Sequence, residues 1–338
     1  ERLFVEKLFA DSVARKKIEE ISSLEVEKLT GDASTRRYYR IEGSGKTYVV
    51  CLANPLEKEQ NMSPFMEVQK ILESSDIRVP KIFDYDPSLG YFLEEDLGDQ
   101  TLLNYLSNNE DQKNEFNIYK KVIDILINIH KIPTNEMIDK VCIEQAFDFN
   151  KLYSEIEFTN KFLITNFLGH KTSKEESEQL KRGFSKICQE LSEQERLLTH
   201  RDFHTRNIMV LNDEFVTIDF QDARMGIAQY DLVSILEDAY YKIERSDKYQ
   251  LKKYYYTTFL SKRDQGYSFE QFLYHYDLMA VQRSYKAMGS FTYINATRGD
   301  QRYLKYVGYC FENLRSILAR HEEFQELRST LSKIYYAC

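Results

Sequence analysis

The sequence predicts an α+β protein of two lobes, with a small antiparallel β-sheet N-lobe and a larger, mainly helical C-lobe. Strand-like segments separated by short turns crowd into the first 97 residues, whereas apolar residues at helical spacing dominate residues 98–338. A length of 338 residues also exceeds what one small core usually holds. We therefore place the N-lobe at residues 1–97 and the C-lobe at residues 98–338.

The N-lobe should contain five strands and one helix. The first three strands are expected in LEVEKLT, RRYYRIEG and KTYVVCLAN, joined by the turns GDAST and EGSGKT. The second turn imitates a phosphate-binding loop, but a strand follows where that loop needs a helix, so we interpret it as a hairpin. Ser63 and Pro64 are typical of a helix start. Two more strands are expected in RVPKIFDYD and GYFLEEDLGD, the second of which leaves the sheet at Gly98.

The C-lobe should be built from long helices. FNIYKKVIDILINIHKI has the spacing of a buried helix, and two more helices are expected at Lys151–Phe167 and Ser173–Leu191, with a turn around Gly169. EFVTIDFQDARMG is interpreted as a strand and a loop, followed by helices to the end of the chain. Asp231 is expected to be the N-cap of the first of these helices and to tie down the polar loop HRDFHTRN at residues 200–207.

Composition excludes several kinds of partner. The formal net charge is −8, so neither a nucleic acid nor an anionic membrane surface is an expected partner, and any phosphate site must be local. Five scattered cysteines without a CxxC pair suggest free thiols and a cytoplasmic location. No apolar stretch approaches the roughly 20 residues that a membrane span requires.

The segment LLTHRDFHTRNIMV carries the clearest functional signal. Asp202 and Asn207 lie five residues apart, and Asp219 ends an apolar strand twelve residues later. Phosphoryl transfer from ATP needs a carboxylate that orients the acceptor hydroxyl and oxygen ligands for Mg²⁺. We assign the first role to Asp202 and the second to Asn207 and Asp219, with ATP and Mg²⁺ as the implied cofactors. The spacing matches the kinase pattern H-R-D-x-x-x-x-N followed by a D-F-G-like turn.

Turn capping alone would account for any one of these polar residues but not for their joint spacing. His200 is expected to support the loop structurally. Arg206 is predicted to act catalytically by reaching the γ-phosphate, because the transferred anion requires a cation. For His204, a phosphate contact and a surface position are both open.

The chain resembles the aminoglycoside phosphotransferase-like branch of the protein-kinase-like fold. The resemblance rests on GDASTRRYYR, FLEEDLGDQT, EIEFTNKFL, HRDFHTRNIMV, IDFQDARMGIAQYDLVSILEDAY and QRSYKAMGSFTYI. Within that branch it is most similar to bacterial kinases that phosphorylate the anomeric hydroxyl of N-acetylmuramate and N-acetylglucosamine in cell-wall recycling. The resemblance implies that Ser34 and Thr35 cover the ATP phosphates and that adenine lies near Glu94–Leu97, for which we name Glu95 and Leu97.

One departure from protein kinases concerns the phosphate-binding cation. The third strand, TYVVCLAN, has no lysine where protein kinases place one. Arg36 and Arg37 are the nearest cations, and strand alternation directs only one of them inward. We choose Arg37, while the alternative that both are surface charges is open.

The acceptor should be a small-molecule sugar held by the helical lobe. Asp222, Arg224, Glu155 and Arg283 are the candidate substrate residues, with structural salt bridges as the competing explanation. Glu237 stands where the related enzymes commonly carry arginine, which makes a neutral amino sugar as plausible as the muramyl acid. Two alternatives are a kinase of another small hydroxyl acceptor, such as an aminoglycoside or choline, and a non-catalytic nucleotide-binding module. The oligomeric state is left open.

Overall fold

The computed structural model describes residues 1–29, 36–55, 63–108, 114–134 and 141–337. Its internal contacts define two compact units, Glu1–Tyr105 with Asn207–Gln221, and Leu106–Arg206 with Asp222–Cys338. These units are defined by the packing of the chain. The boundary predicted between residues 97 and 98 refers to the nucleotide-binding and acceptor-binding lobes, and it stays a prediction. Among the described helices, none combines the length and apolar character needed to cross a bilayer.

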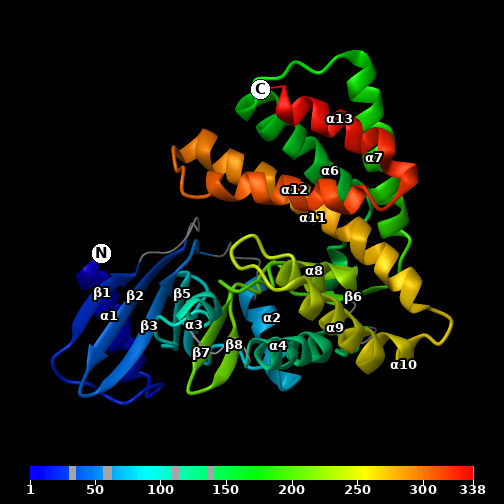
Figure 1. The fold of residues 1–338 in the computed structure, drawn as a ribbon. Coiled ribbons are helices and arrows are strands. Elements are labelled where there is room, and N and C mark those ends of the chain that lie inside the picture. Colours follow the sequence, from blue (N-terminus) through cyan, green and yellow to red (C-terminus); the bar gives the residue numbers. More distant parts are fainter. Residues whose placement is uncertain (30–35, 56–62, 109–113, 135–140, 338) are drawn as a thin grey trace. The chain divides into compact units, whose positions relative to one another are not determined.

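A five-stranded antiparallel sheet is the framework of the first unit, in the order β1-β2-β3-β5-β4 (Figure 1). The hairpin between β2 and β3 turns at Ser44 and Gly45, whose φ angles of 50° and 75° are those of a two-residue hairpin turn. The segment that imitated a phosphate loop is therefore a hairpin, as predicted. The strands are β1 (Glu25–Leu29), β2 (Arg37–Gly43), β3 (Lys46–Leu52), β4 (Ile82–Asp86) and β5 (Tyr91–Glu95).

Strand alternation divides the side chains of this sheet between two faces. One face packs against helix α1 (Arg2–Ala14). We did not expect this helix from the sequence, because no side chain caps its start. The other face carries Phe92, whose ring meets Phe65 of helix α2 (Pro64–Ser74) edge-on at 5.0 Å. Ser63 accepts a hydrogen bond from the backbone N–H of Met66, which confirms the predicted N-cap.

A second hairpin, β7 (Ile208–Leu211) with β8 (Glu214–Thr217), also belongs to the first unit. It packs through Met209 and Val216 against Leu97, just beyond the end of β5. A bridge between Thr101 and Met209 adds a backbone connection. Thr101 directly precedes helix α3 (Leu102–Asn108).

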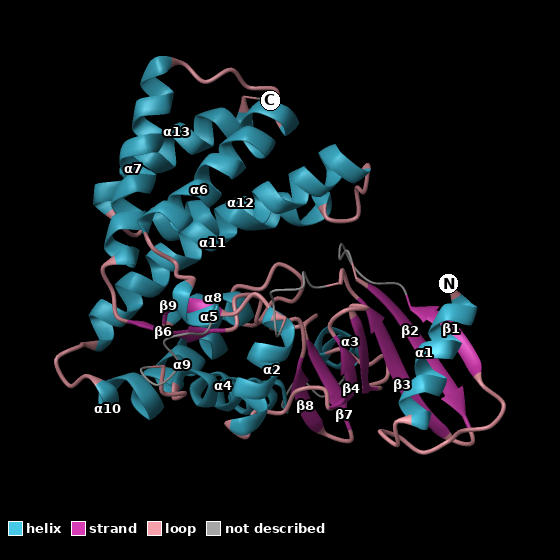
Figure 2. Cartoon of the chain, turned by 180° about the vertical axis from the view of Figure 1, so that it is seen from behind, coloured by secondary structure: helices cyan, strands magenta, loops and turns pink. Residues whose placement is uncertain are grey.

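The second unit is mainly helical, and α11 is its central element. Figure 2 shows α6, α7, α11, α12 and α13 packed together in this unit, and α11 contacts α6, α7, α8 and α12. The predicted helix starting at Ser173 is confirmed, with a capping box between Ser173 and Glu176. The helices are α4 (Glu115–His130), α5 (Val141–Glu144), α6 (Phe149–Thr159), α7 (Lys174–Ser192), α8 (Gln229–Leu236), α9 (Arg245–Tyr255), α10 (Ser261–Arg263), α11 (Phe269–Arg298), α12 (Val307–Leu318) and α13 (Gln325–Tyr336).

Shorter helical segments complete this unit. The predicted helix over Lys151–Phe167 continues beyond α6 as a π-helical segment, Asn160–Phe167, and the turn after it has Gly169 at a φ of 64°. A second π-helical segment, Tyr256–Leu260, follows α9. Short 3₁₀ turns at Leu304–Tyr306 and Glu322–Phe324 precede α12 and α13.

Strands β6 (Arg196–Thr199) and β9 (Arg224–Ile227) pair in a separate two-stranded sheet. The prediction of a loop over ARMG was therefore wrong, because β6 supplies hydrogen-bond partners that lie 25 or more residues away in the sequence. Glycine suits position 226, since a Cβ there would lie 3.0 Å from the side chains of Phe147 and Thr199. Four cysteines, at 51, 142, 188 and 310, are buried and are not joined in disulfide bonds, which agrees with the thiols predicted from the sequence.

Candidate active site

The loop after β6 carries the predicted catalytic carboxylate in a constrained backbone. Arg201 has a φ of 81°, in the left-handed region that side chains disfavour. Asp231, fully buried in α8, holds this conformation: its carboxylate accepts hydrogen bonds from the backbone N–H groups of His200 at 2.6 Å and Arg201 at 2.9 Å. His200 is buried and packs edge-on against Phe203, which agrees with the structural role expected for it.

The predicted role of Asp231 was half right. It does tie down the catalytic loop, but it is not an N-cap, because α8 begins at Gln229 and its cap position is Ala228. The carboxylate faces the loop instead, since two backbone donors there require an acceptor. A second aspartate, Asp238, accepts hydrogen bonds from the N–H and the hydroxyl of Thr205 at 3.0 and 2.6 Å. The loop is thus fixed on both sides of Asp202.

Asp231→Ala is expected to destabilise the protein and to slow turnover. It leaves the buried N–H of His200 and the partly buried N–H of Arg201 without their acceptor, at up to about 1–3 kcal/mol each, and releases the strained backbone at Arg201. Urea unfolding should show the loss, and ADP release should fall at temperatures where the variant is still folded. Glu178→Ala, at an exposed position of α7, is the control. A variant as stable as wild type would contradict this account of the loop.

Asp202 is surrounded by positive charge. Its carboxylate lies 3.9 Å from Nε of Arg201 and 3.9 Å from Nζ of Lys286, and 28% of its side-chain surface is exposed. Burial by itself would raise the pKa of the Asp202 carboxyl, but the charges of Lys286, Arg201 and Arg283 outweigh it and hold that pKa well below its usual range. Asp202 is therefore an ionised hydrogen-bond acceptor at neutral pH.

The two predicted magnesium ligands are neighbours in the first unit. The β7–β8 hairpin pairs Ile208 with Thr217, and the backbone N–H of Ile218 donates to the carbonyl of Asn207 at 3.0 Å. The hairpin thereby brings Asn207 Nδ2 within 3.3 Å of Asp219 Oδ2, although twelve residues separate them. Asp219 is exposed, with a φ of 63°. The Asn207 amide donates to the Asp219 carboxylate through its nitrogen here, and its oxygen is the atom that would bind a metal. An exposed carboxylate with a neighbouring side-chain amide supplies the few protein oxygen ligands that a magnesium ion takes while it retains water.

The arginine chosen as phosphate-binding cation is not the one directed toward Asp219. Arg37 is exposed and forms an ion pair with Glu1. Arg36, its neighbour, donates to Gln221 Oε1 at 3.0 Å and lies over the Phe65 ring at 5.1 Å. Gln221 in turn donates to Asp219 Oδ1 at 2.7 Å, so Arg36, which directly precedes β2, lies on the side of Asp219. The structure therefore favours Arg36 for the role assigned to Arg37.

The remaining predicted nucleotide residues have different positions. Ser34 and Thr35 lie outside the described residues. Glu95 forms a paired ion bridge to Arg78 at 2.6 and 2.8 Å, and its backbone N–H donates to Lys81. Leu97 is buried against the β7–β8 hairpin. The side chains of Glu95 and Leu97 are both engaged within the protein. Adenine binding by the backbone groups of these two residues stays a prediction.

Glu94 is a buried carboxyl in this region that the sequence did not single out. It lies on β5, and its Oε1 has no hydrogen-bond partner among the described residues. Burial raises the pKa of Glu94 to about 7, although Arg36 and a hydrogen bond from Cys51 oppose the shift. The only sequence signal for it was an acidic residue inside an apolar strand, in YFLEE.

Glu94→Gln is expected to stabilise the protein increasingly as pH rises. The pKa of Glu94 is higher in the folded protein than in the unfolded chain, so the folded state holds the proton more tightly. Wild-type stability therefore falls as pH rises from the unfolded pKa of 4.5 to the folded pKa of about 7. This pKa shift costs the wild-type protein at most about 3 kcal/mol of unfolding free energy at pH values above 7, and nothing at pH values below 4.5. Urea unfolding at pH 4.5 and pH 8, with Glu25→Gln on exposed β1 as control, measures the difference. An advantage that does not change with pH would contradict the raised pKa.

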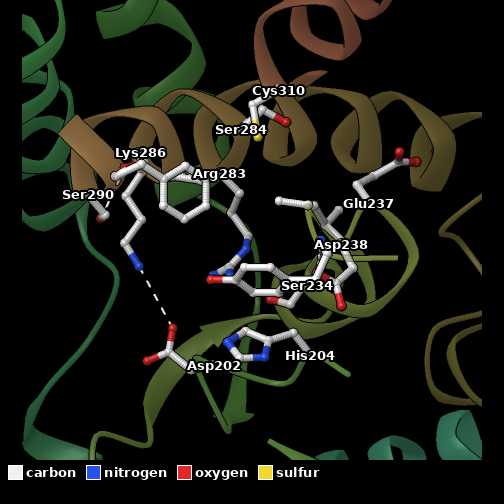
Figure 3. Close-up of a pocket in the computed structure, with 15 residues that line it drawn as sticks. Asp202, His204, Ser234, Glu237, Asp238, Arg283, Ser284, Lys286, Ser290 and Cys310 are labelled. Atoms are coloured by element: carbon white, nitrogen blue, oxygen red, sulfur yellow. Dashed lines mark hydrogen bonds and ion pairs between the residues drawn. The ribbon is translucent and has the colours of Figure 1, made fainter. Parts of the chain in front are cut away.

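Asp202 opens into a pocket within the second unit (Figure 3). The pocket has a volume of about 140 Å³, roughly ten times what one water molecule needs. Figure 3 shows Lys286 and Arg283 extending from α11 toward the side of the pocket that holds Asp202. The other lining residues are His204, Val233, Ser234, Glu237, Asp238, Ala239, Tyr240, Ser284, Ala287, Ser290, Phe291 and Cys310.

Only one of the four predicted substrate residues lines this pocket, namely Arg283, which also donates to the carbonyl of Arg201 at 3.0 Å. Asp222 instead pairs with Arg201 at 2.8 Å. Arg224 is buried, with its guanidinium over the Phe147 ring at 5.3 Å. Glu155 is buried and accepts a hydrogen bond from Gln282 at 3.0 Å. The competing explanation, a structural salt bridge or helix pairing, has a partner in each case, namely Arg201 for Asp222, Asp222 for Arg224 at 4.0 Å and Lys151 for Glu155 at 3.6 Å.

The basic residues of the catalytic loop pack against aromatic rings. Arg206 lies over Tyr240 at 4.9 Å and donates to the hydroxyl of Tyr303 at 3.4 Å. His204 meets Tyr240 edge-on at 5.4 Å and lines the pocket. The γ-phosphate contact assigned to Arg206 remains a prediction. Glu237, also in the pocket wall, accepts hydrogen bonds from Lys248 at 2.7 Å and Tyr276 at 3.0 Å, so its charge is partly balanced.

Solved structures and sequence relatives identify the class and the family. Similar folds include choline kinase from Cryptosporidium parvum, with a TM-score of 0.62 at 12% identity over 96% of this chain and 99% of that one. Another is the ADP-bound aminoglycoside phosphotransferase APH(2'')-Ib, with a TM-score of 0.59 at 16% identity over 92% and 98%. The chain thus has the protein-kinase-like fold of these structures. The model of the phosphotransferase enzyme family (APH) matches residues 25–267, and the chain belongs to this family.

Curated relatives narrow the comparison further. An N-acetylmuramate/N-acetylglucosamine kinase from Pseudomonas aeruginosa is 30% identical over 93% of this chain and 90% of its own length. A protein of the same name from Neisseria meningitidis is 26% identical over 90% and 88%. The resemblance seen in the sequence is therefore confirmed along nearly the whole chain.

Proposed function

We propose that this protein is an ATP- and Mg²⁺-dependent kinase that phosphorylates the anomeric hydroxyl of N-acetylmuramate or N-acetylglucosamine. The observation that carries the proposal is the ionised Asp202 carboxylate at a ligand-sized pocket, in a chain whose relatives bear the name of that activity. An anomeric hydroxyl is more acidic than other sugar hydroxyls, so a weakly basic carboxylate suits it.

In this proposal Asp202 accepts a hydrogen bond from the acceptor hydroxyl and takes its proton as the oxygen attacks the γ-phosphorus of ATP. The new O–P bond forms as the bond to the β,γ-bridging oxygen breaks, and ADP leaves with that electron pair. Asn207 and Asp219 would hold magnesium, which would neutralise charge on the phosphates when bound. Arg36 is the cation we assign to the phosphates in place of the missing strand lysine.

An acceptor panel tests this function. ADP release with ATP and Mg²⁺ should be fast with N-acetylglucosamine or N-acetylmuramate and slow with glucosamine, kanamycin and choline. Phosphorus NMR of the product should show a sugar 1-phosphate. Release that is fastest with choline or kanamycin would replace the proposed acceptor. ATP binding without ADP release on any acceptor would favour a non-catalytic module.

A further inference from the structure

Lys286 is placed to contact the reacting oxygen of the acceptor. It lies on α11, one helical turn beyond Arg283, and 17% of its side-chain surface is exposed. Its Nζ points at Asp202 across the pocket, with 3.9 Å between Nζ and Oδ1 (Figure 3). That separation is too long for a direct hydrogen bond, but a third atom can lie about 2.8 Å from both. A hydroxyl between them could donate to Asp202 and accept from Lys286.

The other cations near Asp202 are engaged with protein groups. Arg201 is paired with Asp222 at 2.8 Å. Arg283 donates to the carbonyl of Arg201 at 3.0 Å and stacks over the Tyr230 ring at 4.3 Å. Among the described residues, Lys286 Nζ makes no direct hydrogen bond, so its three donors are available to a ligand in the pocket. Lys286 is thus the pocket cation best able to bind an acceptor.

We propose that Lys286 is a catalytic residue whose ammonium group hydrogen-bonds the acceptor hydroxyl oxygen that Asp202 orients. This inference rests on the proposed function. As the acceptor proton passes to Asp202 and the O–P bond forms, negative charge develops on the oxygen, and the adjacent ammonium stabilises it. Such help is needed because a carboxylate with a depressed pKa is a weak base.

A role as a mere counter-ion for Asp202 makes different predictions. A counter-ion would stabilise the fold and leave binding of the acceptor unchanged once the protein is folded. A group that contacts the acceptor should affect the sugar steps and spare the nucleotide. Three measurements therefore distinguish the two roles: the KM for sugar, the kcat and the thermal shift that sugar induces. The KM for ATP is measured in the same experiments for comparison.

The test compares Lys286→Met with wild type and with Lys252→Met. Lys252 is a matched control because it is also half-buried in the second unit, over the Tyr276 ring at 4.0 Å, but does not line the pocket. We expect Lys286→Met to lose about 100-fold or more in kcat/KM for the sugar. Its KM for ATP and its ATP–Mg²⁺ thermal shift should stay near wild type, while Lys252→Met keeps its sugar kinetics.

A second measurement guards against loss of structure. Lys286→Ala leaves a space that ethylammonium can enter, and added ethylammonium should restore part of its turnover. Sugar kinetics of Lys286→Met close to those of an active wild type would overturn this inference alone. Parallel loss of the ATP–Mg²⁺ shift without rescue of Lys286→Ala would assign Lys286 a structural role. A wild type that releases no ADP with any sugar would end the proposed function, and this inference with it.

Discussion

Asp202→Asn is expected to lower kcat by at least about 10³-fold while leaving ATP binding nearly intact. The amide has almost the shape of the carboxylate but cannot accept the acceptor proton. It also carries no charge to balance Lys286 and Arg201, which both lie 3.9 Å from the carboxylate. ADP release with N-acetylglucosamine measures the loss, and the thermal shift with ATP and Mg²⁺ shows whether the nucleotide still binds.

Asp213→Asn is the matched control for this change. Asp213 lies in the exposed turn between β7 and β8, with a φ of 63° that asparagine tolerates well. Its kinetics should equal those of wild type. Turnover by Asp202→Asn within tenfold of wild type would remove Asp202 from the chemistry and, with it, the assignment of the pocket as the acceptor site.

Asp219→Asn should lower kcat by about 10²- to 10³-fold and move the Mg²⁺ dependence to higher concentration. The substitution removes the negative charge from the pair that Asp219 forms with Asn207, at 3.3 Å. Because Asp219 is exposed, the melting temperature without ligand should change little. Titrating MgCl₂ against ADP release at fixed ATP measures the shift.

The same Asp213→Asn variant is a stringent control here, because it makes the same substitution at the turn of the hairpin that directly precedes Asp219. An unchanged Mg²⁺ requirement in Asp219→Asn would assign the metal to other groups. A lowered melting temperature without ligand, equal in the two variants, would trace the effect to the hairpin rather than to the metal.

Much of the site was visible in the sequence because its residues are close together along the chain. Asp202 and Asn207 share one loop, and a single hairpin brings Asn207 to Asp219. Hairpins depend on local turn chemistry, so Ser44 and Gly45 also identified the β2–β3 turn correctly. Ser63 and Ser173 marked helix starts for the same reason, since capping involves residues only three positions apart.

The errors have one physical origin, which is contact between distant segments. Strand β9 was missed because its partner is β6. The choice of Arg37 over Arg36 could not take account of the ion pair that Arg37 forms with Glu1 at the start of the chain. Asp231 was expected to cap its own helix, yet its carboxylate serves backbone groups about 30 residues earlier. No local pattern encodes these partners.

The sequence by itself determined the α+β class, the five strands of the main sheet, most of the long helices, the phosphotransferase family resemblance and the three oxygen-bearing residues Asp202, Asn207 and Asp219. All of these depend on periodicity or on short motif spacing, which side-chain chemistry along one segment imposes. Only the tertiary structure decided that Arg36 faces Asp219, that Asp231 holds the strained loop, and that Lys286 reaches Asp202 from α11. Those choices arise from packing between segments 30 to 185 residues apart, where burial and charge pairing select partners that no neighbouring residue specifies.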